Sequence, residues 1–312
     1  MPPTFEPLTA VAGGAIIGVA VGTYMLVAES VAGNSGHLKS LTTGEFGLKE
    51  VGYVAGLTLG GAIMNVFLPA AFEEVPAASL RLLVGSMAVG AGAALGNGCT
   101  SGHGLCGIAR LSPRSFAAVP TFMLAAAATA TLLSGDSILG PMVQPSQTPA
   151  STMRLIQTLA LALAPALVPA FFMPPPSKTA YVSLWTGVTF ASGLTIGGMV
   201  RPSNVVDALS PARPNLTLWA LFMTALLTTT AFYWLARHRG IGAACAPKKA
   251  IDRELLAGAA IFGVGWGATG ICPGPLLVCI GATPFAPGLL LSLGGVVAGF
   301  RLAPTIAARL RW

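Results

Sequence analysis

The chain has 312 residues, of which 54% are hydrophobic and 9% charged, and its mean hydropathy is +0.76. Soluble globular domains carry about 25% charged residues, so this composition excludes an ordinary water-soluble protein and indicates one that crosses a lipid bilayer several times. The net charge of +7 requires no nucleic-acid partner, because basic loops on one side of a membrane account for it.

Nine apolar segments are long enough to cross a bilayer. In chain order they cover residues 8–32, 51–70, 81–99, 115–134, 153–173, 180–200, 215–236, 254–272 and 286–304. Their apolar runs are continuous rather than alternating, which predicts helices and argues against a β-barrel. The predicted fold class is therefore an all-α polytopic membrane protein with about nine transmembrane helices.

Basic residues in the loops predict the orientation of these helices. The loop at 237–253 holds five basic residues against one acidic residue, which is typical of a cytoplasmic loop. Counting spans from it places the N-terminus outside and the C-terminus in the cytoplasm of a multi-pass cell-membrane protein. One loop disagrees, because Arg201 and Arg213 would lie outside with only Asp207 to balance them.

A cysteine pair occurs twice with the same internal spacing, as Cys99 with Cys106 and as Cys272 with Cys279. Aligning residues 82–106 with 255–279 gives seven identities in 25 positions, including three pairs of glycines and both pairs of cysteines. The alignment predicts one membrane domain of four helices, one connecting helix and four more. Its parts are a first repeat at 1–135, a connecting region at 136–179 and an inverted second repeat at 180–312.

Each cysteine motif lies where a helix is predicted to break. Gly102 and Gly104 interrupt the first motif, and the Pro273–Pro275 stretch interrupts the second. Lipid cannot satisfy the freed backbone groups, so such breaks usually line a polar site. A helix that begins after a break directs N–H groups at the gap and favours an anion. The spans hold almost no acidic residue, which argues against a pathway for cations.

A thiol at such a break can act as a metal ligand, a nucleophile or a weak hydrogen-bond donor. The C-x6-C spacing differs from that of zinc sites, so no metal and no cofactor are expected. A nucleophile would have to ionise, which an apolar environment disfavours. A neutral thiol can solvate a soft sulfur-bearing anion without adding like charge.

The plainer alternative is that cysteine is a small apolar residue packed between helices. The duplication beside a break favours a working role for Cys99 and Cys272, whereas Cys106 and Cys279 could simply pack the following helix. Cys245 is expected to have no special role. His103 could donate to an anion or satisfy the freed carbonyls, and both readings stay open.

The motif 96-GNGCTSGHGLCGIARLSPRS-115 resembles the signature of the bacterial YeeE/YedE family of sulfur-compound transporters. The stretches 198-GMVRPSNVVDAL-209 and 263-GVGWGATGICPGP-275 resemble the half-length companion members, as if two short proteins were fused. The resemblance implies thiosulfate uptake past Cys99 and Cys272. Thiosulfate-transporting members also carry a first-helix cysteine, which is absent here; Met25 lies nearby, and Met199 has a similar place in the second half.

The expected function is therefore transport of small sulfur-containing anions, with a cytoplasmic sulfur-accepting protein as a further partner, and not catalysis. A membrane-embedded sulfurtransferase or thiol redox protein is the main alternative, although no CxxC motif or nucleotide loop supports it. A membrane anchor without transport would leave the paired helix breaks unexplained. The candidate pathway residues are Cys99, Cys272, Cys106, Cys279, His103, Met25 and Met199.

Overall fold

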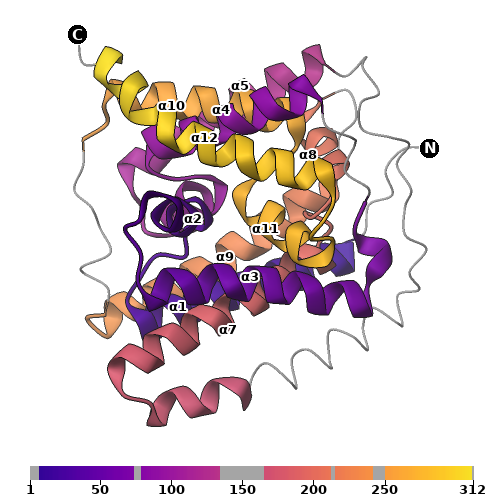
Figure 1. The fold of residues 1–312 in the computed structure, drawn as a ribbon. Coiled ribbons are helices and arrows are strands. Elements are labelled where there is room, and N and C mark those ends of the chain that lie inside the picture. Colours follow the sequence, from indigo (N-terminus) through magenta and orange to yellow (C-terminus); the bar gives the residue numbers. More distant parts are fainter. Residues whose placement is uncertain (1–6, 74–78, 134–164, 212–214, 242–249, 311–312) are drawn as a thin grey trace.

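The computed structural model describes residues 7–73, 79–133, 165–211, 215–241 and 250–310. Eight long helices lie in two layers (Figure 1). The long helices are α1 (Pro7–Ala28), α3 (Leu48–Phe67), α4 (Leu80–Gly96), α5 (Pro113–Leu132), α7 (Pro175–Ile196), α9 (Leu216–His238), α10 (Arg253–Thr269) and α12 (Pro287–Leu310). The shorter ones are α2 (Asn34–Thr43), η1 (Pro69–Ala71), the π-helix η2 (Thr100–Gly107), η3 (Pro165–Phe172), α8 (Pro202–Leu209) and α11 (Pro273–Ala282). Shorter helices such as α2 and α11 lie between the layers, whereas η3 lies on the outer side of α7 (Figure 1).

The predicted all-α polytopic class is confirmed, since the described residues form helices and turns and several helices are apolar enough to span a membrane. Each of the eight long helices matches one of the nine predicted segments. Six helical segments in the described ranges pass a test of length and hydropathy, or seven if α4 and η2 form one bent span. The remaining predicted segment is the fifth, at 153–173; its part up to residue 164 lies outside the described residues, and η3 covers most of the rest.

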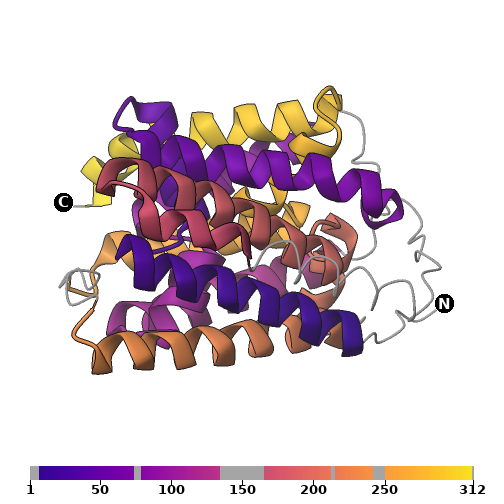
Figure 2. The same cartoon turned by 90° about the horizontal axis from the view of Figure 1, so that it is seen from below.

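The order of the helices within each layer follows from their contacts. One layer runs α9, α1, α7, α3, and Figure 2 shows these helices side by side. The other runs α5, α10, α4, α12. In the middle of each layer, helices from the two halves of the chain run antiparallel: α1 against α7, and α4 against α10. This pairing is what a two-fold relation between the halves would produce; the boundaries at 135 and 180 remain predictions.

The two ends of the bundle are named after the short helices near them. At the α2 end, α1 ends and α3 begins. The start of α5 meets the start of α10 there, because Arg114 contacts Ala250. The helices α4 and α12 also end together at this end. At the α8 end, α7 ends and α9 begins. Figure 1 shows the long helices running between these ends, with α2 nearer one end and α8 nearer the other. The short helices therefore enter the bundle from opposite ends.

Glycines let the helices within a layer approach closely. A Cβ atom added at Gly92 of α4 would meet the backbone of Phe262 of α10, and one added at Gly258 would meet the backbone of Gly96. Membrane helices gain their association energy from such close backbone packing, because lipid provides no hydrophobic drive between them. The glycine repeat that reveals the duplication is thus also the packing surface of the central α4 and α10 pair.

The contact between α4 and α12 can be tested at Gly90, where an added Cβ would meet the Val296 carbonyl. We expect Gly90→Ala to lower the free energy of unfolding by about 1–3 kcal/mol, because the helix backbones must move apart. The matched control is Gly294→Ala on α12, where nothing lies within 4 Å of an added Cβ. Thermal unfolding of both purified variants provides the measurement, and equal melting temperatures would contradict the close packing.

Candidate functional site

Two long helices break between the layers, one in each half of the chain. α4 ends at Gly96, and η2 follows at a bend of 43°. α10 ends at Thr269, and α11 begins at Pro273. Asn97 and Gly270 follow the two helix ends with φ of 56° and 68°, a left-handed conformation that asparagine and glycine tolerate. Polar or flexible residues at these positions therefore turn the chain back into the bundle.

The breaks bring Cys99 and Cys272 together in the interior. Cys99 directly precedes η2, Cys272 directly precedes α11, and both side chains are buried. Their thiols form a hydrogen bond with each other, and Thr100 Oγ1 lies 3.1 Å from Cys272 Sγ. Ser101 Oγ lies 3.4 Å from Cys99 Sγ, and the hydroxyl of Ser35 also bonds to that thiol. We call Cys99 and Cys272 the thiol pair.

Three helices begin beside the thiol pair. η2 and α11 follow the two cysteines directly. The backbone N–H of Asn34, the first residue of α2, donates to Ser101 Oγ at 3.1 Å. A Cβ added at Gly274 would meet the side-chain nitrogen of Asn34, so the starts of α2 and α11 touch. The positive ends of three helix dipoles therefore converge on one small region, which suits a negative charge.

A polar cavity of about 530 Å³ lies at the α2 end, and we call it the vestibule. The ends of α1, α4, η2 and α5, together with α2 and the start of α3, form its walls. Its charged lining residues are Glu29, Lys39, Lys49, Glu50, Arg110 and Arg114. Four basic residues against two acidic ones give the vestibule a positive balance, which attracts anions from solution.

A smaller cavity of about 30 Å³ lies on the other side of Cys99, and we call it the central cavity. Cys272, Thr100, Ser101 and Asn34 line it, and none of its lining residues is charged. Ser35 lines the vestibule and bonds to Cys99, whose thiol in turn bonds to Cys272. Cys99 therefore lies between Ser35 of the vestibule wall and Cys272 of the central cavity.

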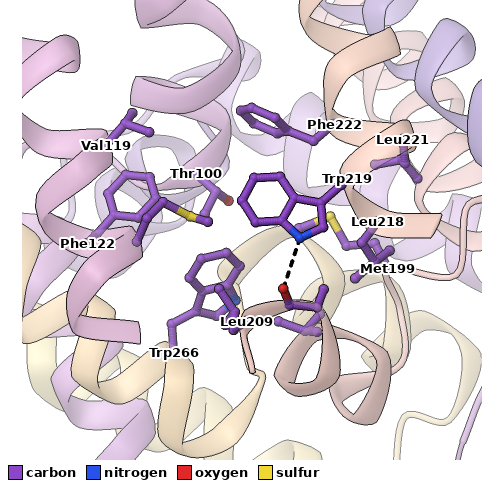
Figure 3. A pocket seen from close by; sticks show the side chains of 13 residues that line it. Thr100, Val119, Phe122, Met199, Leu209, Leu218, Trp219, Leu221, Phe222 and Trp266 are labelled. Carbon is purple, nitrogen blue, oxygen red and sulfur yellow. Dashed lines mark hydrogen bonds between the residues drawn. The ribbon is translucent and has the colours of Figure 1, made fainter. Parts of the chain in front are cut away.

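Beyond the central cavity lies an apolar pocket of about 110 Å³ between α5, α8, α9 and α10 (Figure 3). Aromatic side chains line it, and Trp219 Nε1 donates to the Ala208 carbonyl at 3.0 Å. The aromatic lining residues are Phe122, Trp219, Phe222 and Trp266. Thr100 and Met199 line both this pocket and the central cavity. The thiol pair thus lies between a basic vestibule and an apolar pocket.

Comparisons with known proteins agree with this duplicated architecture. Residues 4–128 match the profile of a family described as sulphur transport. A probable transporter of Xylella fastidiosa strain Temecula1 is 35% identical over 126 residues, which cover 39% of this chain and 90% of the relative. The chain belongs to the sulphur transport family. Residues 179–310 match a second profile, that of a family of unknown function (DUF6691).

Further relatives of this sulphur transport family member are also about half its length. A probable transporter of Xylella fastidiosa strain 9a5c is 34% identical over 126 residues, again 39% of this chain and 90% of the relative. Another from the same strain is 33% identical over 135 residues, 41% of this chain and 91% of the relative. Two successive family profiles, at 4–128 and 179–310, and half-length relatives are what a fusion of two short proteins would leave.

The second cysteines of the duplicated motif lie away from the thiol pair and play matching parts in this family member. Cys106 Sγ donates to the Ala32 carbonyl at 3.8 Å, and Cys279 Sγ donates to the Val200 carbonyl at 3.2 Å. Ala32 lies two residues before α2, and Val200 lies two residues before α8. Each thiol therefore satisfies a carbonyl freed at the entry of a short helix, and the structure places neither in a described cavity wall.

His103 holds the first helix break closed. Its Nε2 lies 3.0 Å from the Gly96 carbonyl, which can only accept, so Nε2 carries the proton. Its Nδ1 lies 3.0 Å from Ser115 Oγ and accepts from that hydroxyl. Of the two readings, the geometry matches satisfaction of a freed carbonyl. Although His103 borders the vestibule, both ring nitrogens are engaged, so it ties the end of α4 to the start of α5.

The two methionines singled out with the cysteines do not have equivalent places. Met25 is buried within α1 and lines none of the three cavities described above. Met199 lies beyond the end of α7 and lines both the central cavity and the apolar pocket. In sequence, Met25 and Met199 are separated by nearly the same number of residues as the two cysteine pairs. The short helices α2 and α8 are separated by fewer residues, so the two halves differ in length between the methionine and the short helix. Met25 is thus a core residue here.

Arg201 belongs to the loop whose charge disagreed with the predicted topology, and its side chain is buried rather than exposed. It is 7% exposed, and its guanidinium donates to the carbonyls of Ala70 and Ala71 in η1. Glu73 accepts hydrogen bonds from the backbone N–H and hydroxyl of Ser203 at the start of α8. The basic residue that disagreed with the topology is therefore a buried structural link. Arg213 and Cys245 lie outside the described residues.

Reasoning from the sequence missed the residues of α2 that border the site. Asn34, Ser35 and His37 lie in a segment that reads as a polar loop between two spans. A signal was present, because Asn34 and His37 are three residues apart and share a helix face. Tyr53 donates to Asn34 Oδ1 at 2.8 Å and so fixes the start of α2.

The anchoring role of Cys279 can be tested by substitution. We expect Cys279→Ala to lower the free energy of unfolding by about 1 kcal/mol, because the buried Val200 carbonyl loses its donor. Cys279→Ser keeps a donor and should lose less stability. Thermal unfolding of the purified variants measures the difference, and identical stability of all three proteins would show that the thiol only fills space.

Proposed function

We propose that this protein carries small sulfur-containing anions across the membrane, with thiosulfate as the first candidate. The observation that carries the proposal is the thiol pair at the meeting point of three helix starts, between a basic vestibule and an uncharged central cavity. Membership of the sulphur transport family and the probable transporters among its relatives support the same function.

The chemistry of the site suits such an anion. Thiols and hydroxyls donate hydrogen bonds while adding no negative charge, and the helix starts add partial positive charge. No acidic residue lines the central cavity, so a metal cation would find no charged ligand among the residues that form it. Cys99 and Cys272 would act in sequence, because Cys99 bonds to Ser35 of the vestibule wall and Cys272 lines the central cavity.

The proposed orientation follows from charge. The α2 end holds most of the described basic residues, and such loops face the cytoplasm in most membrane proteins. The N-terminus would then lie outside and the C-terminus in the cytoplasm. In this conformation the vestibule borders the thiol pair from the cytoplasmic end, and the apolar pocket closes the other end. A cytoplasmic sulfur-accepting protein would meet the anion at the vestibule.

A sulfurtransferase or thiol redox protein is the second candidate, and the contact between the two thiols is the observation that favours it. Such chemistry needs a thiolate, and a base to form one. His103 is the histidine next to the thiol pair in sequence, and both of its nitrogens are already bonded. Transport by neutral thiols therefore fits the arrangement better.

Substitution of the thiol pair tests the proposal. We expect uptake of sulfur-labelled thiosulfate, in cells lacking their own route, to fall about tenfold or more in Cys99→Ala and Cys272→Ala. The loss follows from removing a hydrogen-bond donor from the thiol pair, between the vestibule and the apolar pocket. Cys99→Ser and Cys272→Ser should keep part of the uptake, since a hydroxyl also donates.

Met25→Leu provides the control, because Met25 is a core residue outside the three cavities and should leave uptake unchanged at equal membrane abundance. Equal inactivity of the serine and alanine variants would point to a nucleophilic thiol and favour the second candidate. If all four cysteine variants took up thiosulfate as fast as the native protein, the thiols would only pack the interior, and the proposal would lose its basis.

A further inference from the structure

Two buried polar atoms of the vestibule lack a hydrogen-bond partner within the described part of the chain. They are Nε2 of His37 and Nη1 of Arg110. His37 is 6% exposed, and both residues line the same cavity. A buried polar atom without a partner is unfavourable unless something else satisfies it. Because both residues line one basic cavity, a polar group bound there would supply the partner that each atom lacks.

The surroundings of His37 fix what its free nitrogen can do. The ring stacks on Tyr53 with centroids 4.2 Å apart and meets Tyr24 edge-on at 5.9 Å. The imidazole bonds to the Val31 carbonyl, and since Nε2 has no partner, Nδ1–H is the donor. In the neutral ring Nε2 therefore carries a lone pair, and it becomes a donor only when it takes up a proton.

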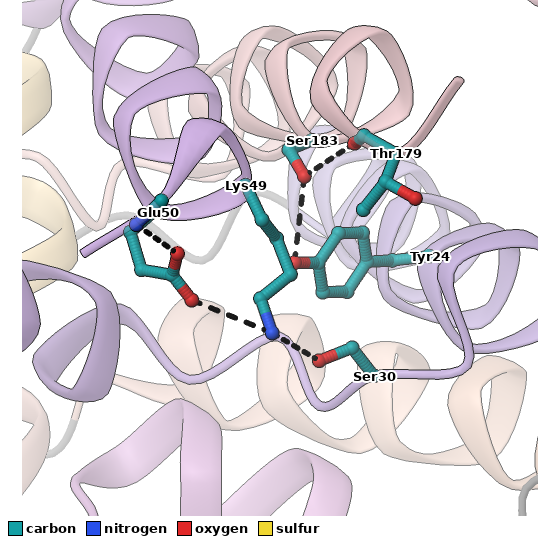
Figure 4. A network of polar contacts seen from close by, with 7 residues as sticks. Tyr24, Ser30, Lys49, Glu50, Thr179 and Ser183 are labelled. Carbon is teal, nitrogen blue, oxygen red and sulfur yellow. Dashed lines mark hydrogen bonds and ion pairs between the residues drawn. The ribbon is translucent and has the colours of Figure 1, made fainter. Parts of the chain in front are cut away.

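Lys49 and Arg114, two other basic residues of the vestibule, are more fully engaged than Arg110. Lys49 pairs with Glu50 at 3.4 Å and donates to Ser30 Oγ at 3.4 Å (Figure 4). Arg114 donates to the Ala250 carbonyl and pairs with Asp252 at 3.4 Å.

Arg110 uses its Nε to donate to the Cys106 carbonyl at 3.1 Å, which fixes the guanidinium in the cavity wall. Its buried Nη1 is then held in place to donate to a ligand.

We propose that the vestibule binds one small sulfur oxyanion, which accepts hydrogen bonds from Arg110 and takes up one proton at Nε2 of His37. The proton comes from water and converts the imidazole into a donor to the anion. The site deepens the proposed transport function, since an anion that reaches Cys99 from the α2 end must cross the vestibule. Binding can nevertheless be measured without any transport.

The charges around His37 set the pH dependence. Facing it are Tyr24 from α1 and Lys49, Glu50 and Tyr53 from α3. The other charged or titratable groups in the cavity wall are Glu29, Lys39, His103, Arg110 and Arg114. Burial lowers the pKa of His37 to about 4, Glu50 opposes this change and Lys49 adds to it. The His37 side chain of the empty site is therefore uncharged near neutral pH.

A bound anion raises the pKa of His37, so the complex holds a proton that the empty site does not. Affinity must then increase as the pH falls through the pKa of the complex, and it levels off near pH 4, where the empty site is protonated as well. Below that pH both forms carry the proton and the dependence ends.

Calorimetric titration of thiosulfate into the purified full-length protein tests the site. Titrations at about pH 6 and about pH 8, in two buffers with different heats of ionisation, report both affinity and proton uptake. We expect uptake of about one proton per anion at the lower pH, and affinity that rises up to about tenfold for each pH unit lowered. No proton uptake at either pH would overturn the proposal.

Variants of the two residues give separate readouts. His37→Gln should bind thiosulfate with no proton uptake and with affinity that no longer depends on pH. Arg110→Gln should bind about tenfold or more weakly at both pH values, while Arg110→Lys keeps the charge and should lose less. The matched control is Arg237→Gln, an exposed residue of α9 that does not line the vestibule. Thermal unfolding checks that each variant is folded.

The outcomes distinguish this site from transport itself. Cys272→Ala should keep pH-dependent binding in the vestibule while losing uptake, because Cys272 lines the central cavity instead. An unchanged pH dependence in His37→Gln, or chloride binding as tight as thiosulfate binding, would overturn the oxyanion site even where native uptake is intact. If the native protein binds thiosulfate in the vestibule but shows no uptake, the transport proposal alone would be contradicted.

Discussion

The whole arrangement depends on one constraint, which is that a helix broken inside a membrane must satisfy its freed backbone groups within the protein. His103 does this at the end of α4, Cys106 before α2 and Cys279 before α8. Arg201 likewise donates to a free backbone carbonyl of η1, that of Ala71. Because these side chains meet backbone demands, the residues between them are held in place. Cys99 and Cys272 are therefore positioned by bonds that do not involve their own thiols.

Duplication explains the thiol pair, and divergence explains the different surroundings on its two sides. Antiparallel packing of two similar halves brings equivalent breaks to one place, so a single cysteine position supplies both thiols. The halves no longer match beyond that place. His37 is the fourth residue of α2, whereas Val205 is the fourth residue of α8. In the register that aligns the cysteine pairs, Thr283 occupies the position of Arg110. One side of the thiol pair is consequently basic and the other apolar.

The sequence predicted the spans and helix breaks that occur in both halves, and it missed features that occur in one half only, such as the polar helix α2. Eight of the spans and the two helix breaks follow from apolar runs, glycines and prolines that appear in both halves. The helix α2 has a polar sequence of ordinary loop composition, and it is a helix because Tyr53 and Ser101 bond to its first residue. Met25 lies in the core rather than at the predicted pathway. The segment between the first long helix and the short helix that follows it differs in length between the two halves, so Met25 and Met199 do not have equivalent positions.

The unequal surroundings constrain how an anion could pass the thiol pair. In transporters with inverted repeats, the halves can exchange conformations, so that the cavity at one end closes as its counterpart opens. Here the counterpart of the vestibule would be lined by Val205 and Thr283, and Arg201 fixes the segment beside α8. Opening that end would produce an apolar mouth with little electrostatic attraction for an anion. Under the proposed function, the basic vestibule would then supply most of the binding energy that replaces hydration, so the anion would be held at the α2 end and only weakly at the α8 end.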